Sequence, residues 1–338
     1  KRILILGAGL SSNTLISYLE KQAVIHHWEL KVGDRDERVA RQKCSPSTQT
    51  FQLDLSDKEF LDQAVCASDL VISMLPARLH PVVAEVCLSN GKSLMTASYE
   101  SPRMKEMEKE VRSKGLLFLN EMGLDPGIDH MSAMQVIERI REQGHQLTGF
   151  ESFTGGLVAP ESDDNPWHYK FSWNPTNVVL AGWPGPAIFR QMGKLKYIPY
   201  NRLFRRTEFM DIEGYGRFEG YANRDSMKYI EKYNLQGIET IYRGTLRRPG
   251  FSQAWNIFVQ LGATDNSYIM EHSAEMSHRD FINSFLYYHP ADSVEVKLYR
   301  AFHIDQDSPL IEMLAQGRPL VRATILTHEG STPRSAGS

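Results

Sequence analysis

The sequence predicts an α/β protein in which a doubly wound parallel sheet is followed by a second, mixed α/β domain. Over the first 120 residues, short apolar runs alternate with amphipathic stretches, the pattern of a parallel sheet wrapped by helices. The first run passes directly into Gly7-Ala8-Gly9, a glycine-rich turn before a predicted helix. After Asn120 the residue pattern changes to Gly/Pro-rich bends and aromatic segments. A chain of 338 residues is long enough for two domains. We expect the first domain at residues 1–124, the second at 125–330 and a flexible tail at 331–338.

The first domain is expected to contain six strands, with helices between them. The apolar runs place the strands at Ile3–Leu6, Trp28–Val32, Thr50–Leu53, Leu70–Leu75, Ser93–Thr96 and Leu116–Leu119. Helical periodicity and start signals place helices at Ser12–Lys21, Asp57–Val65, Val82–Leu88, Pro102–Ser113 and, later in the chain, Met131–Ile140. Ser56 and Glu59 are spaced as a capping box for the helix at Asp57–Val65.

Composition argues against several classes of function. The formal net charge of −3 gives no general attraction to nucleic acid or to an anionic membrane, so neither is an expected partner. No apolar run approaches the ~18 residues of a membrane span. The three cysteines are too few and too scattered for a disulfide framework, which favours a cytoplasmic protein. His272 and His278 lie well apart around a helix, and no metal site is expected.

The most unusual segment runs from Gly155 to Trp173. Its nineteen positions contain two glycines, two prolines, three acidic residues and two tryptophans, which no strand or helix requires. Such a density of polar residues, and of glycines and prolines with their unusual backbone preferences, is typical of a long loop built around a ligand. Together with the glycine-rich turn, this loop indicates an enzyme that uses a dinucleotide and a polar, charged substrate.

The glycine-rich turn reads Gly7-x-Gly9-x-x-Ser12. Gly7 permits the tight turn, and Gly9 lets the backbone approach a pyrophosphate at the N-terminus of the helix. Ser12 stands where a third glycine is usual, so the string alone is a weak pattern. Its place between a predicted strand and a predicted helix makes it a strong one, typical of a Rossmann-type dinucleotide site.

The end of the second strand bears on the choice of nicotinamide cofactor. Asp34 can accept a hydrogen bond from a ribose 2′-hydroxyl and would repel a 2′-phosphate, which favours NAD. The neighbouring Arg35 could instead neutralise that phosphate, so the sequence also permits NADP. The alternative is that both are solvent-facing charges at a turn.

Polar or turn-forming residues follow other strands at the same edge of the sheet, where doubly wound sheets bind ligands. They are Asp54, Ser73 to Pro76, Ala97-Ser98-Tyr99 and Gly123-Leu124-Asp125-Pro126-Gly127. Pro126 fixes the chain beside Asp125, and a carboxylate held in this way can bind an ammonium group or exchange a proton. The alternative is that Asp125 caps the following helix, for which Asp129 is also available.

Arginines in the second domain offer a second set of candidates. Arg243 and Arg247 flank a Gly-Thr-Leu segment, and Arg224 lies in an Asn-Arg-Asp string. The guanidinium group suits bidentate capture of a carboxylate. Each of these arginines could equally form a surface ion pair.

These segments together resemble the family of glutamate-forming saccharopine dehydrogenases, or saccharopine reductases, of lysine metabolism. The resemblance covers roughly residues 1–260 and lies in Asp69–Pro76, Thr96–Tyr99, Gly123–His130, Gly155–Trp173, Asn223–Ser226 and Arg243–Arg247. Beyond about residue 265, the family's C-terminal segment that returns to the Rossmann domain is not recognisable. Many relatives have a cysteine where this chain has Thr154, so we expect no thiol chemistry.

The resemblance implies a Rossmann domain and a second mixed α/β domain that binds saccharopine and forms a homodimer. It implies cofactor contacts at Gly7, Ala8, Gly9, Leu10, Ser11, Gly33, Asp34, Arg35, Leu53, Asp54, Met74, Ala97, Ser98, Leu124, Asp125, Pro126 and Trp173. It implies saccharopine contacts at Ser98, Tyr99, Asp125, Arg224, Thr245, Leu246 and Arg247. The resemblance also implies that NADP-using fungal relatives have basic residues at the position where this chain has Asp34. The acidic residue here favours NAD.

The implied reaction is the reversible oxidation of saccharopine to L-glutamate and 2-aminoadipate 6-semialdehyde. A hydride leaves the carbon attached to the secondary amine for the nicotinamide, and water hydrolyses the resulting imine. Asp125 is the expected acid/base, Tyr99 helps to orient the substrate, and Arg224 and Arg247 hold carboxylates of this tricarboxylate. Two alternatives stay open: a carboxynorspermidine-type imine reductase, and a non-catalytic relative that binds NAD(P).

Overall fold

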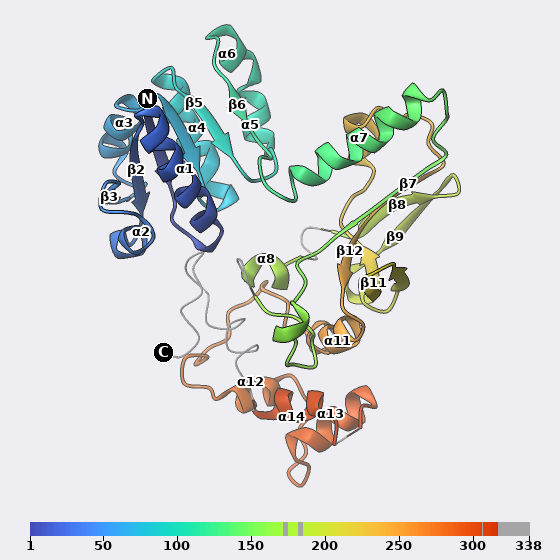
Figure 1. Ribbon diagram of the computed structural model, residues 1–338. Helices are drawn as coiled ribbons and strands as arrows, with labels where there is room; N and C mark the ends of the chain where they lie inside the picture. Colours follow the sequence, from blue (N-terminus) through green and yellow to red (C-terminus); the bar gives the residue numbers. More distant parts are fainter. Residues whose placement is uncertain (172–174, 182–184, 306, 317–338) are drawn as a thin grey trace. The chain divides into compact units, whose positions relative to one another are not determined.

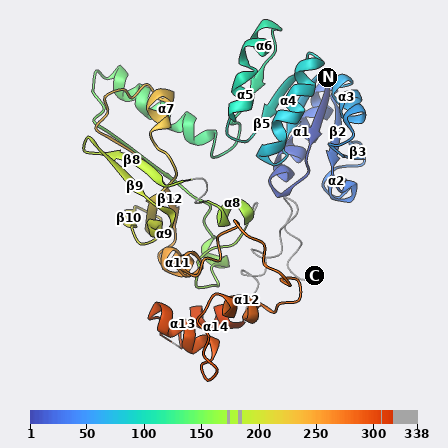
Figure 2. The same ribbon diagram turned by 180° about the vertical axis from the view of Figure 1, so that it is seen from behind.

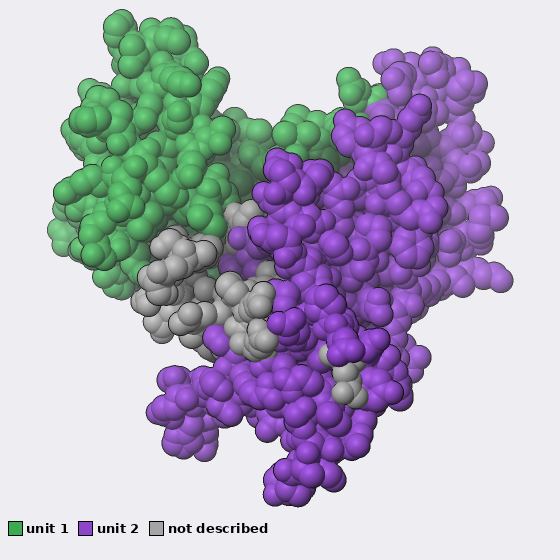
Figure 3. Space-filling view, turned by 60° about the horizontal axis from the view of Figure 1, so that its bottom comes forward, with its two compact units in different colours: residues 1–135 green, residues 136–338 purple. Residues whose placement is uncertain are grey.

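The computed structural model describes residues 1–171, 175–181, 185–305 and 307–316. The chain forms two compact units, residues 1–135 and residues 136–338, which we call unit 1 and unit 2 (Figures 1 and 3). The division lies inside helix α7 (Ile128–Glu142), later in the chain than the boundary expected at residue 125. Asp125 and Pro126 therefore belong to unit 1.

Unit 1 is built on a six-stranded parallel sheet in the order β3-β2-β1-β4-β5-β6. The strands are β1 (Arg2–Leu6), β2 (Glu29–Asp34), β3 (Gln49–Gln52), β4 (Leu70–Ser73), β5 (Ser93–Thr96) and β6 (Phe118–Leu119). This order reverses direction between β1 and β4, as in doubly wound dinucleotide-binding sheets. The predicted fold class of the first domain is confirmed.

Helices cover both faces of this sheet because its strands are apolar on both sides. Ile3 and Ile5 pack with α1 (Asn13–His26) and α2 (Glu37–Lys43) on one face. Leu4 and Leu6 belong to the core on the opposite face. The helices on that face are α3 (Lys58–Cys66), α4 (His80–Ser89), α5 (Pro102–Glu106) and α6 (Glu108–Ser113). Alternate side chains of β1 thus serve two cores, as expected for a buried parallel strand.

Three local features differ from the expectation. Helix α2 buries only Ala40, so it leaves no apolar periodicity in the sequence. Helix α3 is capped by Asp57, which accepts the N–H of Phe60 at 2.9 Å, and not by Ser56, whose hydroxyl is bound to Asp54. The helix expected at Pro102–Ser113 is divided into α5 and α6 at Met107, whose side chain is buried in the core.

Unit 2 contains a mixed sheet, which confirms the expected class of the second domain. Its order is β10-β11-β12-β8-β9, and β7 pairs in parallel with β12. The strands are β7 (Gly149–Thr154), β8 (Ala187–Gln191), β9 (Lys194–Ile198), β10 (Glu208–Ile212), β11 (Gly216–Ala222) and β12 (Thr240–Arg247). Strand β12 is therefore central, and its end determines where Thr245, Leu246 and Arg247 lie.

Helix α11 (Phe251–Leu261) supplies much of the apolar core of unit 2. It packs with aromatic residues of the sheet and with α12 (His278–Ser284), α13 (Val294–Phe302) and α14 (Pro309–Gln316), which lie together in Figure 2. Short helices α8 (Pro175–Val179), α9 (Tyr200–Leu203) and α10 (Lys228–Lys232) lie in the connections. No described helix is both long enough and apolar enough to cross a membrane.

The long loop after β7 has a structural role that its composition did not indicate. Trp167 and Tyr169 are 0% and 2% exposed, and Trp167 stacks on Phe258 of α11 with ring centres 5.8 Å apart. The aromatic residues of this loop thus complete the core of unit 2. The interpretation of the whole segment as a loop built around a ligand does not account for these two residues, because burial of large rings is itself a structural need.

Candidate functional site

Gly7 sits at a point where the backbone of two strands converges. Its N–H donates to the carbonyl oxygen of Gly33 at 2.7 Å, and its φ is +102°. A Cβ at this position would lie 2.9 Å from the backbone carbonyl of Met74. Glycine is therefore required both for the conformation of the turn and for its close approach to the end of β4.

Gly9 has no such structural requirement. Its φ is −66°, and a Cβ would meet no protein atom within 4 Å. The space beside it is open, which fits the expectation that a ligand approaches the backbone here. Its carbonyl oxygen accepts hydrogen bonds from the hydroxyl of Ser12 and from the ammonium group of Lys43, both at 2.7 Å.

Ser12 and Lys43 explain how the turn is held without a third glycine. Ser12 is 1% exposed and ends the 3₁₀ turn (Leu10–Ser12) that precedes α1. Burial lowers the pKa of Lys43, while the nearby Asp34 carboxylate partly opposes this shift. Sequence reasoning missed Lys43 because α2, which carries it, was not expected.

Asp34 is held by backbone donors at the end of β2. Its Oδ2 accepts the N–H of Ala8 at 2.7 Å, and its Oδ1 accepts the N–H of Asp36 at 3.1 Å. Arg35 is exposed. Asp34 thus fixes the glycine-rich turn and presents its remaining lone pairs at the position where a ribose is expected.

The other predicted cofactor residues of unit 1 lie along the same edge of the sheet. Leu53 donates its N–H to Asp34 and buries its side chain in the core, so only its backbone can face a ligand. Asp54 is exposed, and hydrogen bonds from the hydroxyl and N–H of Ser56 lower its pKa. Met74 follows β4 and donates its N–H to Leu6.

The turn after β6 brings Asp125 against the residues that follow β5. Tyr99 donates its hydroxyl proton to Oδ1 of Asp125 at 2.6 Å. The N–H of Gly123 donates to the carbonyl of Pro126, and the Asp125–Pro126 peptide bond is cis. A Cβ on Gly123 would be 3.1 Å from the carbonyl oxygen of Ala97, so the turn packs closely on the end of β5. The predicted pair of acid/base and orienting residue is therefore in direct contact.

A second titratable group adjoins this turn. His130 of α7 lies 3.1 Å from Oε2 of Glu121 and 3.6 Å from Oδ2 of Asp129. Asp129 also accepts the N–H of Gly127 at 2.7 Å. These side chains support the segment that carries Asp125. The described residues contain no cluster of three or more potential metal ligands.

Two buried side chains, Ser73 and His80, lie behind Ser98, and these three residues were not predicted as a group. The hydroxyl of Ser73 lies 2.9 Å from Nδ1 of His80, and Nε2 of His80 lies 2.8 Å from the hydroxyl of Ser98. His80 is 3% exposed, and burial lowers its pKa to about 4. The usable signal in the sequence was a His-Pro pair at the start of the helix that follows a strand ending in serine.

Unit 2 contains the predicted arginines. Arg247 is 7% exposed, and its guanidinium carbon lies 4.8 Å from the ring centre of Tyr169 and 5.1 Å from that of Phe251. Its Nη1 donates to the carbonyls of Gly156 and Leu246 at 3.2 and 3.0 Å. No carboxylate among the described residues pairs with Arg247, and its buried Nε has no acceptor there. A buried cation without a counter-ion is suited to bind an anion.

The remaining predicted substrate residues are less closely grouped. In the backbone register of the β11–β12 ladder, Thr245 lies opposite Tyr221 and Arg247 lies opposite Glu219, and no ion pair joins these side chains in the described part of the chain. Arg224 is exposed and follows the other end of β11 at a φ of +47°. Arg224 thus lies beyond the C-terminal end of β11, whereas Arg247 is level with Glu219 inside that strand. The predicted cofactor residue Trp173 lies outside the described residues.

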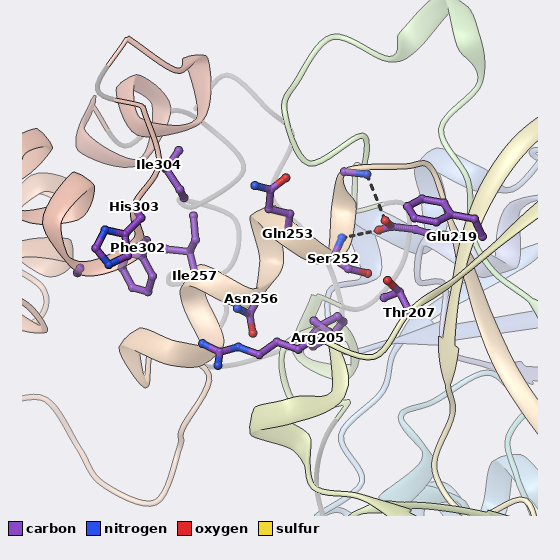
Figure 4. A pocket seen from close by; sticks show the side chains of 14 residues that line it. Arg205, Thr207, Glu219, Ser252, Gln253, Asn256, Ile257, Phe302, His303 and Ile304 are labelled. Carbon is purple, nitrogen blue, oxygen red and sulfur yellow. Dashed lines mark hydrogen bonds between the residues drawn. The ribbon is translucent and has the colours of Figure 1, made fainter.

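A cavity of about 460 Å³ lies in unit 2 between α11 and the segment that follows α13 (Figure 4). Its wall includes Gln253, Asn256 and the buried carboxylate of Glu219, which accepts the N–H groups of Gly250 and Ser252. None of the predicted site residues lines this cavity. The predicted residues thus form two separate groups: the strand ends of unit 1, and Arg247 with its neighbours in unit 2.

Substitution of the two glycines should separate folding from cofactor binding. Gly7→Ala is expected to lower the free energy of unfolding by more than about 1 kcal/mol, because it adds a strained φ and a backbone clash. Gly9→Ala is expected to change it by less than about 0.5 kcal/mol, yet to weaken NAD(H) binding about tenfold or more by filling the space beside the turn. Denaturant unfolding and fluorescence titration measure the two effects. Unchanged cofactor affinity in Gly9→Ala would remove the turn from the binding site.

Comparison with known proteins identifies two matching family models. The model described as saccharopine dehydrogenase NADP binding domain matches residues 3–119, and the one described as saccharopine dehydrogenase C-terminal domain matches residues 123–318. The second match continues well past residue 265, beyond which the sequence alone showed no resemblance. Sequence similarity to the family thus covers both units.

Individual relatives agree with these models. The chain is 40% identical over 265 residues to the mitochondrial alpha-aminoadipic semialdehyde synthase of Mus musculus, covering 78% of this chain and 28% of that protein. It is 36% identical over 268 residues to the saccharopine dehydrogenase [NADP(+), L-glutamate-forming] of Schizosaccharomyces pombe, covering 78% and 58%. The solved structure of apo saccharopine dehydrogenase (L-Glu forming) from Saccharomyces cerevisiae superposes with a TM-score of 0.79 at 30% identity, covering 94% of this chain and 71% of that one. The chain thus spans about a quarter of the length of the Mus musculus protein and about three fifths of the length of the Schizosaccharomyces pombe protein.

Proposed function

The chain belongs to the saccharopine dehydrogenase family, and we propose that it oxidises saccharopine with a nicotinamide cofactor. A hydride leaves the lysine-side carbon attached to the secondary nitrogen, and a C=N bond forms between that carbon and the nitrogen. Water adds to this imine, and cleavage of the C–N bond releases L-glutamate and 2-aminoadipate 6-semialdehyde. In the reverse direction the same residues serve imine reduction.

The hydrogen bond from Tyr99 to Asp125 is the observation that carries this proposal. Oxidation of the amine requires that its proton be removed before the hydride leaves, and hydrolysis of the imine requires an activated water. A half-buried carboxylate beside a phenol at the carboxyl edge of the sheet can accept the first proton and release it to solvent. It can then accept the proton of the attacking water and return it to the departing amine. Tyr99, which donates to Asp125, holds the carboxylate in one orientation.

The nicotinamide cofactor supplies the hydride acceptor. The open space at Gly9 and the exposed backbone at the start of α1 fit a pyrophosphate, and Asp34 is placed for a ribose. Ala97, Ser98 and Leu124 follow neighbouring strands on the same edge and would lie toward the nicotinamide end. Positioning of the reacting carbon supplies much of the rate acceleration in such a site.

We propose a preference for NAD over NADP, although the fungal relatives bear NADP in their names. The carboxylate of Asp34 is fixed by two N–H donors and would face a 2′-phosphate with like charge. Asp34→Asn should therefore lower the ratio of kcat/KM for NAD to that for NADP by about tenfold or more. Asp36→Asn removes the same charge from a carboxylate that pairs with Arg38, and should leave the ratio nearly unchanged. An unaltered ratio in Asp34→Asn would contradict this assignment.

The substrate carboxylates need cationic partners, and Arg247 is our first candidate. It is buried and lacks a counter-ion in the described part of the chain, whereas Arg224 is exposed and well separated from it along the strand. We propose that Arg247 binds one carboxylate and that Arg224 contacts another at the rim, with Thr245 and Leu246 between them along β12. An imine reductase for polyamine substrates would leave such an arginine unpaired.

Turnover with purified protein tests the proposal. Saccharopine with NAD or NADP should yield reduced cofactor, L-glutamate and the semialdehyde in equal amounts, measured by absorbance and mass spectrometry. Cofactor binding without turnover would instead identify a non-catalytic relative. Turnover of carboxynorspermidine at a higher kcat/KM than saccharopine would identify the polyamine-type reductase.

Assembly and location belong to the same proposal. We propose a homodimer in the cytoplasm, in keeping with the family resemblance and with the absence of a membrane-spanning helix among the described residues. Sedimentation velocity measures the first property. A monomer at micromolar concentration would contradict it.

A further inference from the structure

Ser73, His80 and Ser98 form a continuous chain of hydrogen bonds that leads from the sheet interior to the proposed site. Ser73 is the last residue of β4 and is 0% exposed, and His80 is the first residue of α4. Ser98 follows β5 and is half-buried. The two bonds measure 2.9 and 2.8 Å, so one imidazole bridges two hydroxyl groups.

The proton arrangement in this chain follows from the burial of Ser73. A neutral imidazole has one N–H and one acceptor nitrogen, and burial keeps His80 neutral near pH 7 by lowering its pKa to about 4. Among the described residues, the only hydrogen-bond partner of the Ser73 hydroxyl is Nδ1 of His80. If Nδ1 carried the proton, the proton of Ser73 would be buried without an acceptor, which is costly. The arrangement that satisfies every group has Ser73 donating to Nδ1 and Nε2–H donating to Ser98.

This arrangement determines what Ser98 can do. Its oxygen accepts from His80, so its own proton points elsewhere and can donate to a ligand. The hydroxyl lies one residue before Tyr99, at the strand end where substrate and nicotinamide are expected to meet. Its natural partner there is an anionic oxygen, because hydrogen bonds to charged acceptors are the stronger ones.

We propose that His80 is a positioning residue that makes Ser98 a hydrogen-bond donor to a carboxylate of the bound substrate. The assignment of the acceptor depends on the proposed function, whereas the proton arrangement does not. In this proposal His80 acts only through Ser98, to which its Nε2 is hydrogen-bonded.

The proton arrangement is tested by long-range ¹H–¹⁵N correlation spectra of the histidine rings in the full chain, with the His80 signals assigned by their loss in His80→Gln. We expect a neutral ring protonated at Nε2 at neutral pH. A ring protonated at Nδ1, or a charged ring, would overturn the inference. This result is obtained even if the protein shows no turnover, so it is separable from the proposed function.

The role of His80 is tested by its effect on substrate affinity. His80→Leu and Ser98→Ala should each raise KM for saccharopine by about tenfold, with a smaller effect on kcat. In His80→Gln the amide nitrogen can replace Nε2 as donor, so KM should stay within about threefold of the wild type. Because both residues act through one hydrogen bond, the double variant should be no worse than Ser98→Ala alone. Multiplicative effects in the double variant, or no rescue by glutamine, would overturn the positioning role.

Discussion

Replacement of Asp125 by asparagine is expected to lower kcat for saccharopine oxidation by about 100- to 10,000-fold. The amide keeps the size of the side chain and an oxygen that accepts from Tyr99, but it cannot take a proton from the substrate amine. The carboxylate is not needed for the glycine-rich turn, so the affinity for the nicotinamide cofactor should change little. Steady-state kinetics and cofactor titration measure the two quantities.

Two further variants show whether the loss of rate in Asp125→Asn is due to the loss of this proton acceptor. Tyr99→Phe removes the donor to Asp125 and keeps the carboxylate, so its loss of rate should be smaller than that of Asp125→Asn. Asp62→Asn makes the same chemical change in α3, where the carboxylate binds Asn90, and should leave the rate unaltered. Full activity of Asp125→Asn would remove this residue from the mechanism, and equal losses of rate and of cofactor affinity would indicate a binding role instead.

The second large effect is expected at Arg247. Arg247→Met should raise KM for saccharopine by about 10- to 100-fold, because a charge-assisted hydrogen bond to a carboxylate contributes about 1.5–3 kcal/mol. The free energy of unfolding should stay within about 1 kcal/mol of the wild type, since a buried cation without a counter-ion contributes little stability. Loss of binding without loss of stability is the signature of a residue kept for its ligand.

The neighbouring arginine provides a matched control. The guanidinium of Arg248 lies 4.9 Å from the ring centre of Phe218, and the residue is not part of the predicted site. Arg248→Met removes the same charge one residue away and should leave KM within about threefold of the wild type. If Arg247→Met unfolds the protein while Arg248→Met does not, Arg247 serves the core and the carboxylate assignment fails.

The fold of unit 1 was largely predictable because most of its strands combine a short apolar run with a turn-forming end. Parallel strands buried on both faces read as continuous apolar segments, as in Ile3–Leu6. Helix α2 was missed because it buries only Ala40, which leaves no periodic signal. The cap of α3 was misplaced by one residue because Ser56 and Asp57 both suit the position, and only the contact with Asp54 decides between them.

The sheet of unit 2 could not be derived from local patterns. Strands β9 and β10 are mostly exposed, and apolar residues such as Leu195, Tyr197 and Phe209 face solvent, so apolar positions there do not mark a buried face. Strand β12 pairs with β7 and β8, which are distant in sequence, and such pairing depends on the whole fold. The burial of Trp167 and Tyr169 in the loop after β7 depends on contacts with α11, so it also could not be predicted from the local sequence.

The positions of site residues that depend on strand topology were predictable from the sequence. The contacts between site residues that depend on side-chain packing were not. Carboxyl ends of parallel strands meet at one edge, so the grouping of Gly7, Asp34 and Ser98 follows from the strand pattern. The contact between Tyr99 and Asp125 depends on the turn at residues 123–127, which no spacing rule describes. His80 was missed because a single histidine in an apolar helix is most often a core residue.

Isotope transfer from labelled saccharopine tests the central claim most directly. Saccharopine deuterated at the lysine-side carbon attached to the secondary nitrogen is incubated with the protein and oxidised cofactor, and the reduced nicotinamide is examined by mass spectrometry and proton NMR. We expect deuterium to appear on the reduced nicotinamide and unlabelled L-glutamate to be released. Reduced cofactor without deuterium, or transfer only from the glutamate-side carbon, would contradict it.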